Sequence, residues 1–261
     1  MPLPIIHPNY PTPIHEQAIQ TTISHFSQQP EVEAIILIGS GARGKSVGDL
    51  DLHLLVQPDV SKQSRIALEL QWNNLNETET VFEQLRQRGL FSRIDFDIDD
   101  GNFTPKSRGW TSSPDEFELG VGNIVAYSYP LWQGSDYYEQ LRNRWLPYYD
   151  ETLRRQRLES IRRYCTNNLE HIPHFVGREL YFQAFNRLYD AFHEFLQALF
   201  IARRTYPIAY DKWIREQVEE ILELPELYRQ LVTILEISQF ESDQIAQKGA
   251  LLRHLLEQYT A

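Results

Sequence analysis

The chain is poor in sulfur and has no long apolar run. Its 261 residues include one cysteine, Cys165, and one methionine, Met1. A single cysteine excludes an intrachain disulfide and a zinc site built from several thiolates. No apolar run approaches the ~20 residues needed to cross a bilayer, and the first residues lack the basic segment of a signal peptide. These absences predict a cytoplasmic protein with no membrane partner.

Positive charge is also scarce. The chain has 25 Lys and Arg residues against 36 Asp and Glu residues, a formal net charge of −11, and most of the excess lies in the first 150 residues. Broad nucleic-acid binding is disfavoured, because it depends on neutralisation of phosphates by Lys and Arg. The same excess is compatible with a cationic small-molecule partner, although ordinary solubility explains most of it.

Residues 39–46 read GSGARGKS, which matches two phosphate-binding motifs at once. One match is the dinucleotide motif G-x-G-x-x-G and the other is the P-loop motif G-x-x-x-x-G-K-[ST]. Both motifs require a helix directly after the glycines, because the helix N-terminus holds the phosphates. The following residues 49–56, DLDLHLLV, instead alternate between polar and apolar before ending in an apolar run. This alternation predicts a strand after the loop and disfavours both motifs.

Asp49 and Asp51 are two residues apart on this predicted strand. Side chains at that spacing point to the same face, so the two carboxylates converge beside the Gly-Ser turn that ends another predicted strand at 34–38. A divalent cation relieves their repulsion, and hard oxygen ligands select Mg²⁺ or Mn²⁺. Gly39 has no side chain and lets a triphosphate approach the backbone, while the Ser40 hydroxyl can bond a phosphate oxygen. Arg43 and Lys45 are further candidates for phosphate contacts.

The order of strand, Gly-Ser, short loop and Asp-apolar-Asp-apolar resembles the DNA polymerase beta-type nucleotidyltransferase superfamily. The GSxARG form at residues 39–44 is closest in character to small and aminoglycoside-type adenylyltransferases. The resemblance implies transfer of a nucleoside monophosphate, with AMP from ATP favoured, to a hydroxyl of a small-molecule acceptor, with release of pyrophosphate. It implies Mg²⁺ or Mn²⁺ held by Asp49 and Asp51, and a nucleotide-binding role for Gly39 and Ser40.

A third strand is predicted around residues 92–98, SRIDFDI, where Asp95 and Asp97 share one face. In the superfamily that this chain resembles, a third carboxylate on a neighbouring strand completes the metal site or deprotonates the acceptor hydroxyl. The pattern of an acid between apolar residues early in the strand aligns Asp95 with that role, and Asp97 is the alternative. A solvent-facing edge strand without a catalytic role is the remaining interpretation.

The order of predicted elements indicates an α+β fold. A helix at about 14–28, the strands at 34–38 and 49–56, a helix-favouring stretch at 62–88 and the third strand form a small mixed sheet with helices on one side. Residues 101–150 are rich in turns and aromatic residues, and a helix start is predicted at residues 113–116. Beyond residue 150 the pattern predicts helices at 150–169, 177–204, 211–222, 225–238 and 243–259, with Pro173, Pro207 and Pro225 as breakers. The expected domains are a catalytic domain at 1–140 and a helical substrate-binding bundle at 141–261.

Two other function classes stay open at this stage. A catalytically inactive or antitoxin-like binding module would keep this fold without turnover, and the candidate acids do not distinguish it from an enzyme. A P-loop kinase or NTPase would need a helix at 47–58 and a separate acidic strand end, which the sequence does not supply.

Overall fold

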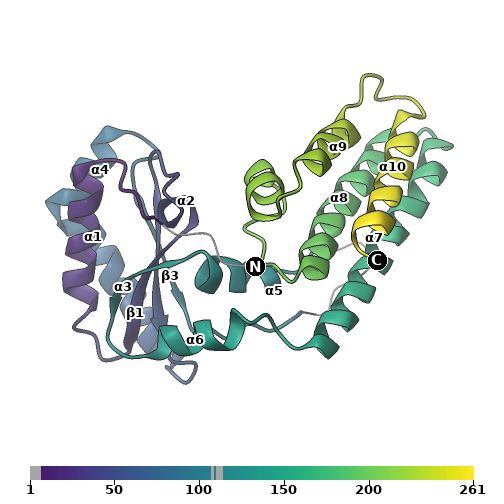
Figure 1. Cartoon of the computed structure of the whole chain (residues 1–261). Coiled ribbons are helices and arrows are strands. Elements are labelled where there is room, and N and C mark those ends of the chain that lie inside the picture. Colours follow the sequence, from purple (N-terminus) through teal and green to yellow (C-terminus); the bar gives the residue numbers. More distant parts are fainter. Residues whose placement is uncertain (1–6, 107–108, 110–113) are drawn as a thin grey trace. The chain divides into compact units, whose positions relative to one another are not determined.

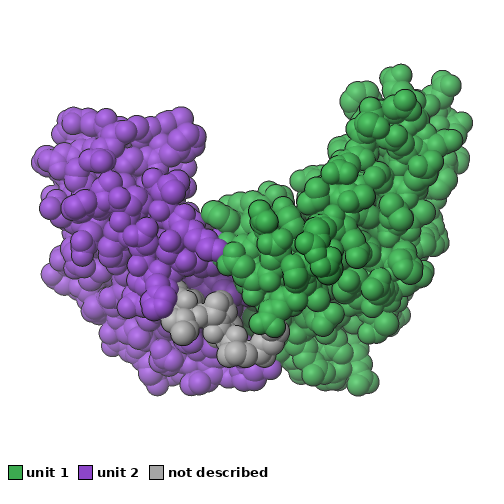
Figure 2. Space-filling model, turned by 45° about the horizontal axis from the view of Figure 1, so that its top comes forward, with its two compact units in different colours: residues 1, 105–119, 148–261 green, residues 2–104, 120–147 purple. Residues whose placement is uncertain are grey.

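The computed structural model describes residues 7–106, 109 and 114–261. These residues form two compact units, coloured separately in Figure 2. The sheet unit contains residues 2–104 and 120–147, and the helical unit contains residues 105–119 and 148–261. The chain therefore leaves the sheet unit after Thr104, returns to it at Gly120 and leaves it again after Pro147.

The sheet unit is built on a mixed four-stranded sheet. Its strands are β1 (Val32–Ile38), β2 (Leu50–Val56), β3 (Ile94–Asp99) and β4 (Tyr129–Gln133), in the spatial order β3-β2-β1-β4. β1 pairs antiparallel with both β2 and β4, whereas β2 and β3 are parallel. The parallel pair is possible because a long helical connection lies between β2 and β3. The strands predicted from alternation are confirmed, with β2 beginning one residue later than expected and β3 two residues later.

One face of this sheet is covered by helices, and the other carries polar side chains such as Asp51 together with buried apolar ones such as Ile36. The helices α1 (Pro13–Phe26), α3 (Lys62–Thr78) and α4 (Thr80–Arg88) supply Ile19, Trp72 and Phe82 to a core shared with the apolar positions of the sheet. Figure 1 shows these helices together on one side of the strands. The sheet positions that join this core are Ile35, Leu37, Leu50, Leu52 and Leu54. The alternating positions, which include Asp51, point to the opposite face.

The stretch at 101–147 contains more regular structure than its turn-rich composition suggests. It forms α5 (Phe117–Val121), the π-helix η1 (Gly122–Ala126), β4 and α6 (Tyr137–Trp145). β4 tolerates Pro130 because it is an edge strand, and α6 buries Tyr137, Tyr138, Leu141 and Trp145 at helical spacing. The helix expected at 113–116 begins instead at Phe117, and residue 113 lies outside the described residues.

The helical unit consists of α7 (Glu151–Val176), α8 (Tyr181–Arg203), the π-helix η2 (Glu216–Ile221), α9 (Pro225–Leu235) and α10 (Gln244–Tyr259). α7, α8 and α10 share one apolar core. The expectation that Pro173 lies between the first two helices of this unit is wrong, since α7 continues to Val176. Pro173 lies in the last turn of α7, where its carbonyl accepts a bond from the Gly177 N–H at 2.9 Å.

The observed α+β architecture, with a mixed sheet followed by a helical part, confirms the predicted fold class. The P-loop interpretation is wrong, because residues 50–56 form the strand β2 where that motif needs a helix. Within the described ranges, no helix combines the length and apolar character needed to cross a membrane.

Candidate active site

The loop that carries the glycine motif makes a single helical turn and then enters β2. α2 (Gly39–Ala42) follows β1 directly, and a turn at residues 43–44 leads to Asp49 and the start of β2 at Leu50. Gly39 has a positive φ of 64°, a backbone conformation that a residue with a side chain adopts only with strain. The glycine therefore makes the sharp change of direction between β1 and the loop possible.

Gly39 also leaves room for an acid. Ile38 is the register partner of Asp51 on the antiparallel strands β1 and β2, so Gly39 lies beside that carboxylate. A Cβ built on Gly39 would lie 2.1 Å from Asp51 Oδ2. The Asp51 carboxylate therefore packs directly against the bare backbone at the start of the loop.

The remaining loop residues hold the loop closed. Arg43 Nη1 donates to the Gly39 carbonyl at 2.8 Å, and the Lys45 backbone N–H donates to the Ser40 carbonyl at 2.8 Å. Ser46 Oγ donates to the Asp49 carbonyl at 2.5 Å. In this arrangement Arg43 stabilises the turn around Gly39, and the bond from Ser46 fixes the residue that precedes β2.

The parallel pairing of β2 and β3 brings two of the candidate acids together. Asp51 and Asp95 are register partners, and both side chains are half-buried. Asp97 is instead the partner of His53 and is exposed, with its Oδ1 accepting a bond from the Ile98 N–H at 2.8 Å. The register thus separates the two acids of β3 that the sequence pattern alone left as alternatives.

Arg93 is a charged residue of this site to which the sequence analysis gave no role. Its Nε donates to Asp95 Oδ1 at 2.8 Å, and its carbonyl accepts a bond from the Leu50 N–H at 3.0 Å. The hydrogen bond to Asp95 and the charges of Asp95, Asp49 and Asp51 raise the pKa of Arg93 above its usual value. A basic residue two positions before Asp95 on an alternating strand was the signal that could have revealed it.

We refer to Asp49, Asp51 and Asp95 as the acid cluster. The buried side chain of His15, on α1, contacts the segments that carry this cluster. His15 Nε2 lies 3.2 Å from Ser92 Oγ, and His15 Nδ1 lies 2.8 Å from Thr12 Oγ1. Burial lowers the pKa of His15, and a backbone hydrogen bond at Gly48 opposes this shift only partly. The imidazole therefore connects the segments that enter β2 and β3.

Further along the same two strands, polar groups are already paired. His53 Nδ1 lies 2.6 Å from Asp99 Oδ2, and Arg65 Nη2 donates to Asp100 Oδ2 at 2.9 Å. These contacts occupy the acids that follow Asp97. The acid cluster lies at the beginning of β2 and β3, beside the bare backbone of Gly39.

The acid cluster has the donor chemistry of a magnesium site. Its carboxylate oxygens are hard donors, and Mg²⁺ is usually bound through one or two carboxylates together with substrate phosphates. As placed in the described residues, no three or more His, Cys, Asp or Glu side chains are arranged to hold a metal ion by themselves. The pair Asp51 and Asp95, next to the bare backbone of Gly39, fits a cation that arrives with a phosphate ligand.

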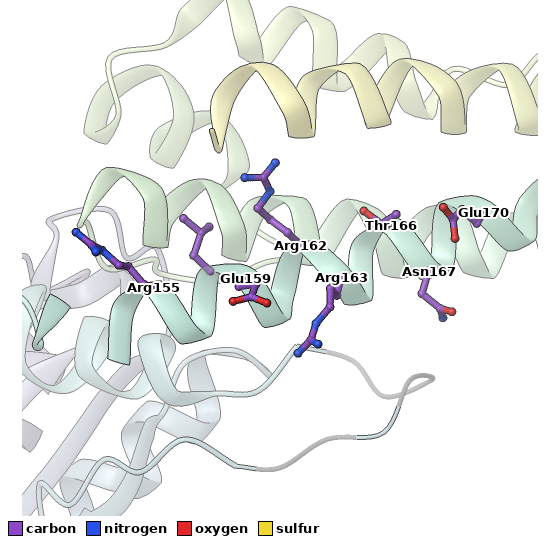
Figure 3. Close-up of a pocket in the computed structure, with 8 residues that line it drawn as sticks. Arg155, Glu159, Arg162, Arg163, Thr166, Asn167 and Glu170 are labelled. Atoms are coloured by element: carbon purple, nitrogen blue, oxygen red, sulfur yellow. The ribbon is translucent and has the colours of Figure 1, made fainter. Parts of the chain in front are cut away.

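The arginines that open α7 are mostly engaged within the helical unit. Arg154 and Arg155 both donate to Glu151, and Arg162 Nη1 donates to the Thr260 carbonyl at 3.0 Å. A shallow groove of about 570 Å³ runs along one face of α7 (Figure 3). Arg155, Arg162 and Arg163 line it together with Glu159 and Glu170, so its charge is mixed.

Arg157 is also engaged within the helical unit, but unlike the other arginines of α7 it is buried in a charged cluster. Its guanidinium donates to both carboxylate oxygens of Asp115, at 2.9 and 2.6 Å, and to both of Glu118, at 2.6 Å each. Gln197 Nε2 donates to the same two acids, at 2.8 and 2.9 Å. Burial raises the pKa of Asp115, but the bonds and charge of Arg157 and the bond from Gln197 outweigh it, and the net shift is downward. The cluster joins residues 105–119 to α7 and α8.

Comparison with known proteins identifies no family for the chain. No family model matches it, and no curated protein matches it. Among solved structures, it is similar to a nucleotidyltransferase-like protein from Exiguobacterium sibiricum, with 16% sequence identity and a TM-score of 0.46, over 93% of this chain and 74% of that chain. Identity and structural similarity at this level do not establish a family.

Proposed function

We propose that the protein is a metal-dependent nucleotidyltransferase that moves a nucleoside monophosphate to an acceptor hydroxyl and releases pyrophosphate. The observation that carries this proposal is the register pairing of Asp51 with Asp95 beside the bare backbone of Gly39. Two carboxylates on adjacent strands next to a glycine turn provide a place for a cation and for the phosphates that accompany it. ATP is the favoured donor, on the resemblance of the loop and strand pattern alone.

Each residue of the site has a proposed task. Asp49 and Asp51 hold Mg²⁺ or Mn²⁺, which when bound offsets the negative charge of the triphosphate. The Gly39 backbone and the Ser40 hydroxyl seat phosphate oxygens. Arg43 keeps the turn in place through the Gly39 carbonyl, and Lys45, two residues further along the loop, is a candidate for a direct phosphate contact.

Asp95 is proposed to share the metal ion with Asp51 or to act as the general base, with Asp97 as the alternative. The acceptor hydroxyl oxygen forms a bond to the α-phosphorus, and the bond from that phosphorus to the oxygen bridging the α- and β-phosphates breaks, which releases pyrophosphate. The hydroxyl proton passes to the Asp95 carboxylate, the nearer of the two β3 acids to Asp51 in register. The net charge of −11 is compatible with a small cationic acceptor.

Thermal melting in the presence of nucleotide tests the proposal. Mg²⁺ with a nucleoside triphosphate is expected to stabilise the protein by ~2.7 kcal/mol at 100 times the dissociation constant, and D51N is expected to remove this effect. Release of pyrophosphate, followed with Mg²⁺–ATP and a panel of small hydroxyl compounds, then distinguishes an enzyme from a binding module. Stabilisation without turnover against the whole panel would favour the inactive module, and a melting curve indifferent to all Mg²⁺–nucleotides would contradict the proposal.

A further inference from the structure

Arg93 places a positive charge beside the acid cluster. Its backbone is held at the entrance to β3 by the bond from the Leu50 N–H, and Leu50 lies between Asp49 and Asp51 in the chain. Its side chain bonds Asp95, and its charge is attracted by all three members of the cluster. One guanidinium thus offsets part of the mutual repulsion of three carboxylates.

The contact between Arg93 and Asp95 is exposed and therefore exchangeable. The two side chains retain 51% and 41% of their accessible surface. Exposed ion pairs are weak, because solvent screens them and two long side chains must be ordered. A divalent cation carries twice the charge of a guanidinium and binds the same carboxylate oxygens, so it can displace Arg93 from Asp95.

We propose that Arg93 is a resident counter-cation of the acid cluster, which occupies Asp95 in the metal-free protein and is displaced when the divalent cation binds. The inference rests on the proposed function, since it assigns this residue a task in the same metal site. Arg93 is then a determinant of metal affinity, acting by competition.

Titration of the full chain with Mn²⁺ alone, followed by calorimetry and by water-proton relaxation, tests this inference without any turnover. R93Q removes the charge, and R93K retains it. R215Q is the matched control, because Arg215 forms a similarly exposed ion pair with Glu219 at 2.9 Å in the helical unit and its loss changes the net charge equally. D51N removes a proposed metal ligand. Melting curves without metal verify that each variant is folded.

R93Q is expected to bind Mn²⁺ at least ~5-fold more tightly than the wild type, because a nearby like charge has been removed. R93K and R215Q are expected to stay within about 2-fold of the wild type, since the first keeps the local charge and the second removes an exposed ion pair with Glu219 that does not involve the acid cluster. D51N combined with R93Q is expected to lose the gain.

Three results would overturn the inference. Unchanged or weaker Mn²⁺ binding by R93Q, with binding still dependent on Asp51, would leave the proposed metal site intact and reduce Arg93 to a surface ion pair. Tightening by R93K equal to that by R93Q would rule out competition by charge. Absence of Mn²⁺ binding in both the wild type and R93Q, with and without a nucleoside triphosphate, would remove the metal site, and the proposed function would fail with it.

Discussion

The Asp51 carboxylate occupies the space in which a side chain on Gly39 would begin. The Gly39 backbone has φ of 64°, and an added Cβ would lie 2.1 Å from Asp51 Oδ2. A side chain at position 39, in the turn that ends β1, would therefore have to displace the Asp51 carboxylate on β2.

Gly39→Ala tests this relationship. The substitution is expected to cost about 1–2 kcal/mol in the free energy of unfolding because of the positive φ, and to lower nucleotide binding further by displacing Asp51. Urea unfolding and nucleotide titration measure the two effects. Gly177→Ala is the control, because Gly177 has φ of −63° and an added Cβ makes only ordinary contact with the Pro173 carbonyl. Equal effects from both substitutions would contradict a special role for Gly39.

Asp95→Asn and Asp97→Asn separate the two acids of β3. Asp95 is the register partner of Asp51, whereas Asp97 is one strand repeat away beside His53. We expect Asp95→Asn to reduce turnover by at least ~10²-fold with nucleotide binding largely kept, since a positioned general base contributes about that much. Asp97→Asn is expected to cost far less. Steady-state rates of pyrophosphate release measure both, and small, equal losses would place the base elsewhere.

Arg157→Met is expected to destabilise the helical unit strongly. The change leaves the buried carboxylates of Asp115 and Glu118 without their counter-charge, a loss that typically costs about 3–5 kcal/mol. Arg155→Met is the control, because the bond from Arg155 to Glu151 is exposed and such pairs contribute at most about 1 kcal/mol. Urea unfolding followed by circular dichroism measures the difference, and similar midpoints for the two variants would show that the buried cluster is not a major source of stability.

Stability is expected to fall as the pH drops below about 6.5, the ordinary pKa of histidine. The folded protein holds the pKa of His15 below that value by burial, with the charge of Arg88 adding to the shift. Between the two pKa values the unfolded chain binds more protons, so the contribution of His15 is complete above the unfolded pKa and is lost as the pH falls towards the folded one.

His15→Gln measures this contribution, because glutamine keeps a polar side chain near Ser92 and Thr12 without a titrating group. The slope of stability against pH between about 6.5 and 5 is expected to decrease in the variant, as one proton-binding site is removed. Burial also lowers the pKa of His193 in the helical unit, so His193→Gln serves as the comparison. An unchanged slope in His15→Gln would show that His15 is not coupled to folding in this pH range.

The local pattern of the chain determined its elements and its candidate acids. Alternation at residues 49–56 and 92–98 predicted β2 and β3, and apolar spacing beyond residue 150 predicted the helices, because these periods follow from the geometry of each element alone. The predicted strand after the glycine motif also disfavoured the P-loop interpretation, and the observed strand β2 then excluded it. The sequence pattern did not predict β4 or α6, because Pro130 and a high aromatic content masked a short edge strand and a short helix.

Pairing between distant segments was decided only by the tertiary structure. The parallel register that sets Asp51 beside Asp95 depends on how β3 aligns with β2 after an intervening pair of helices, and no local period encodes that alignment. The same holds for Arg93, whose bond to Asp95 becomes meaningful only once Asp49 and Asp51 lie nearby. It also holds for Arg157, whose partners Asp115 and Glu118 come from a distant segment of the chain. Charges are placed by whichever segments pack around them, so their partners follow from the fold and not from the sequence spacing.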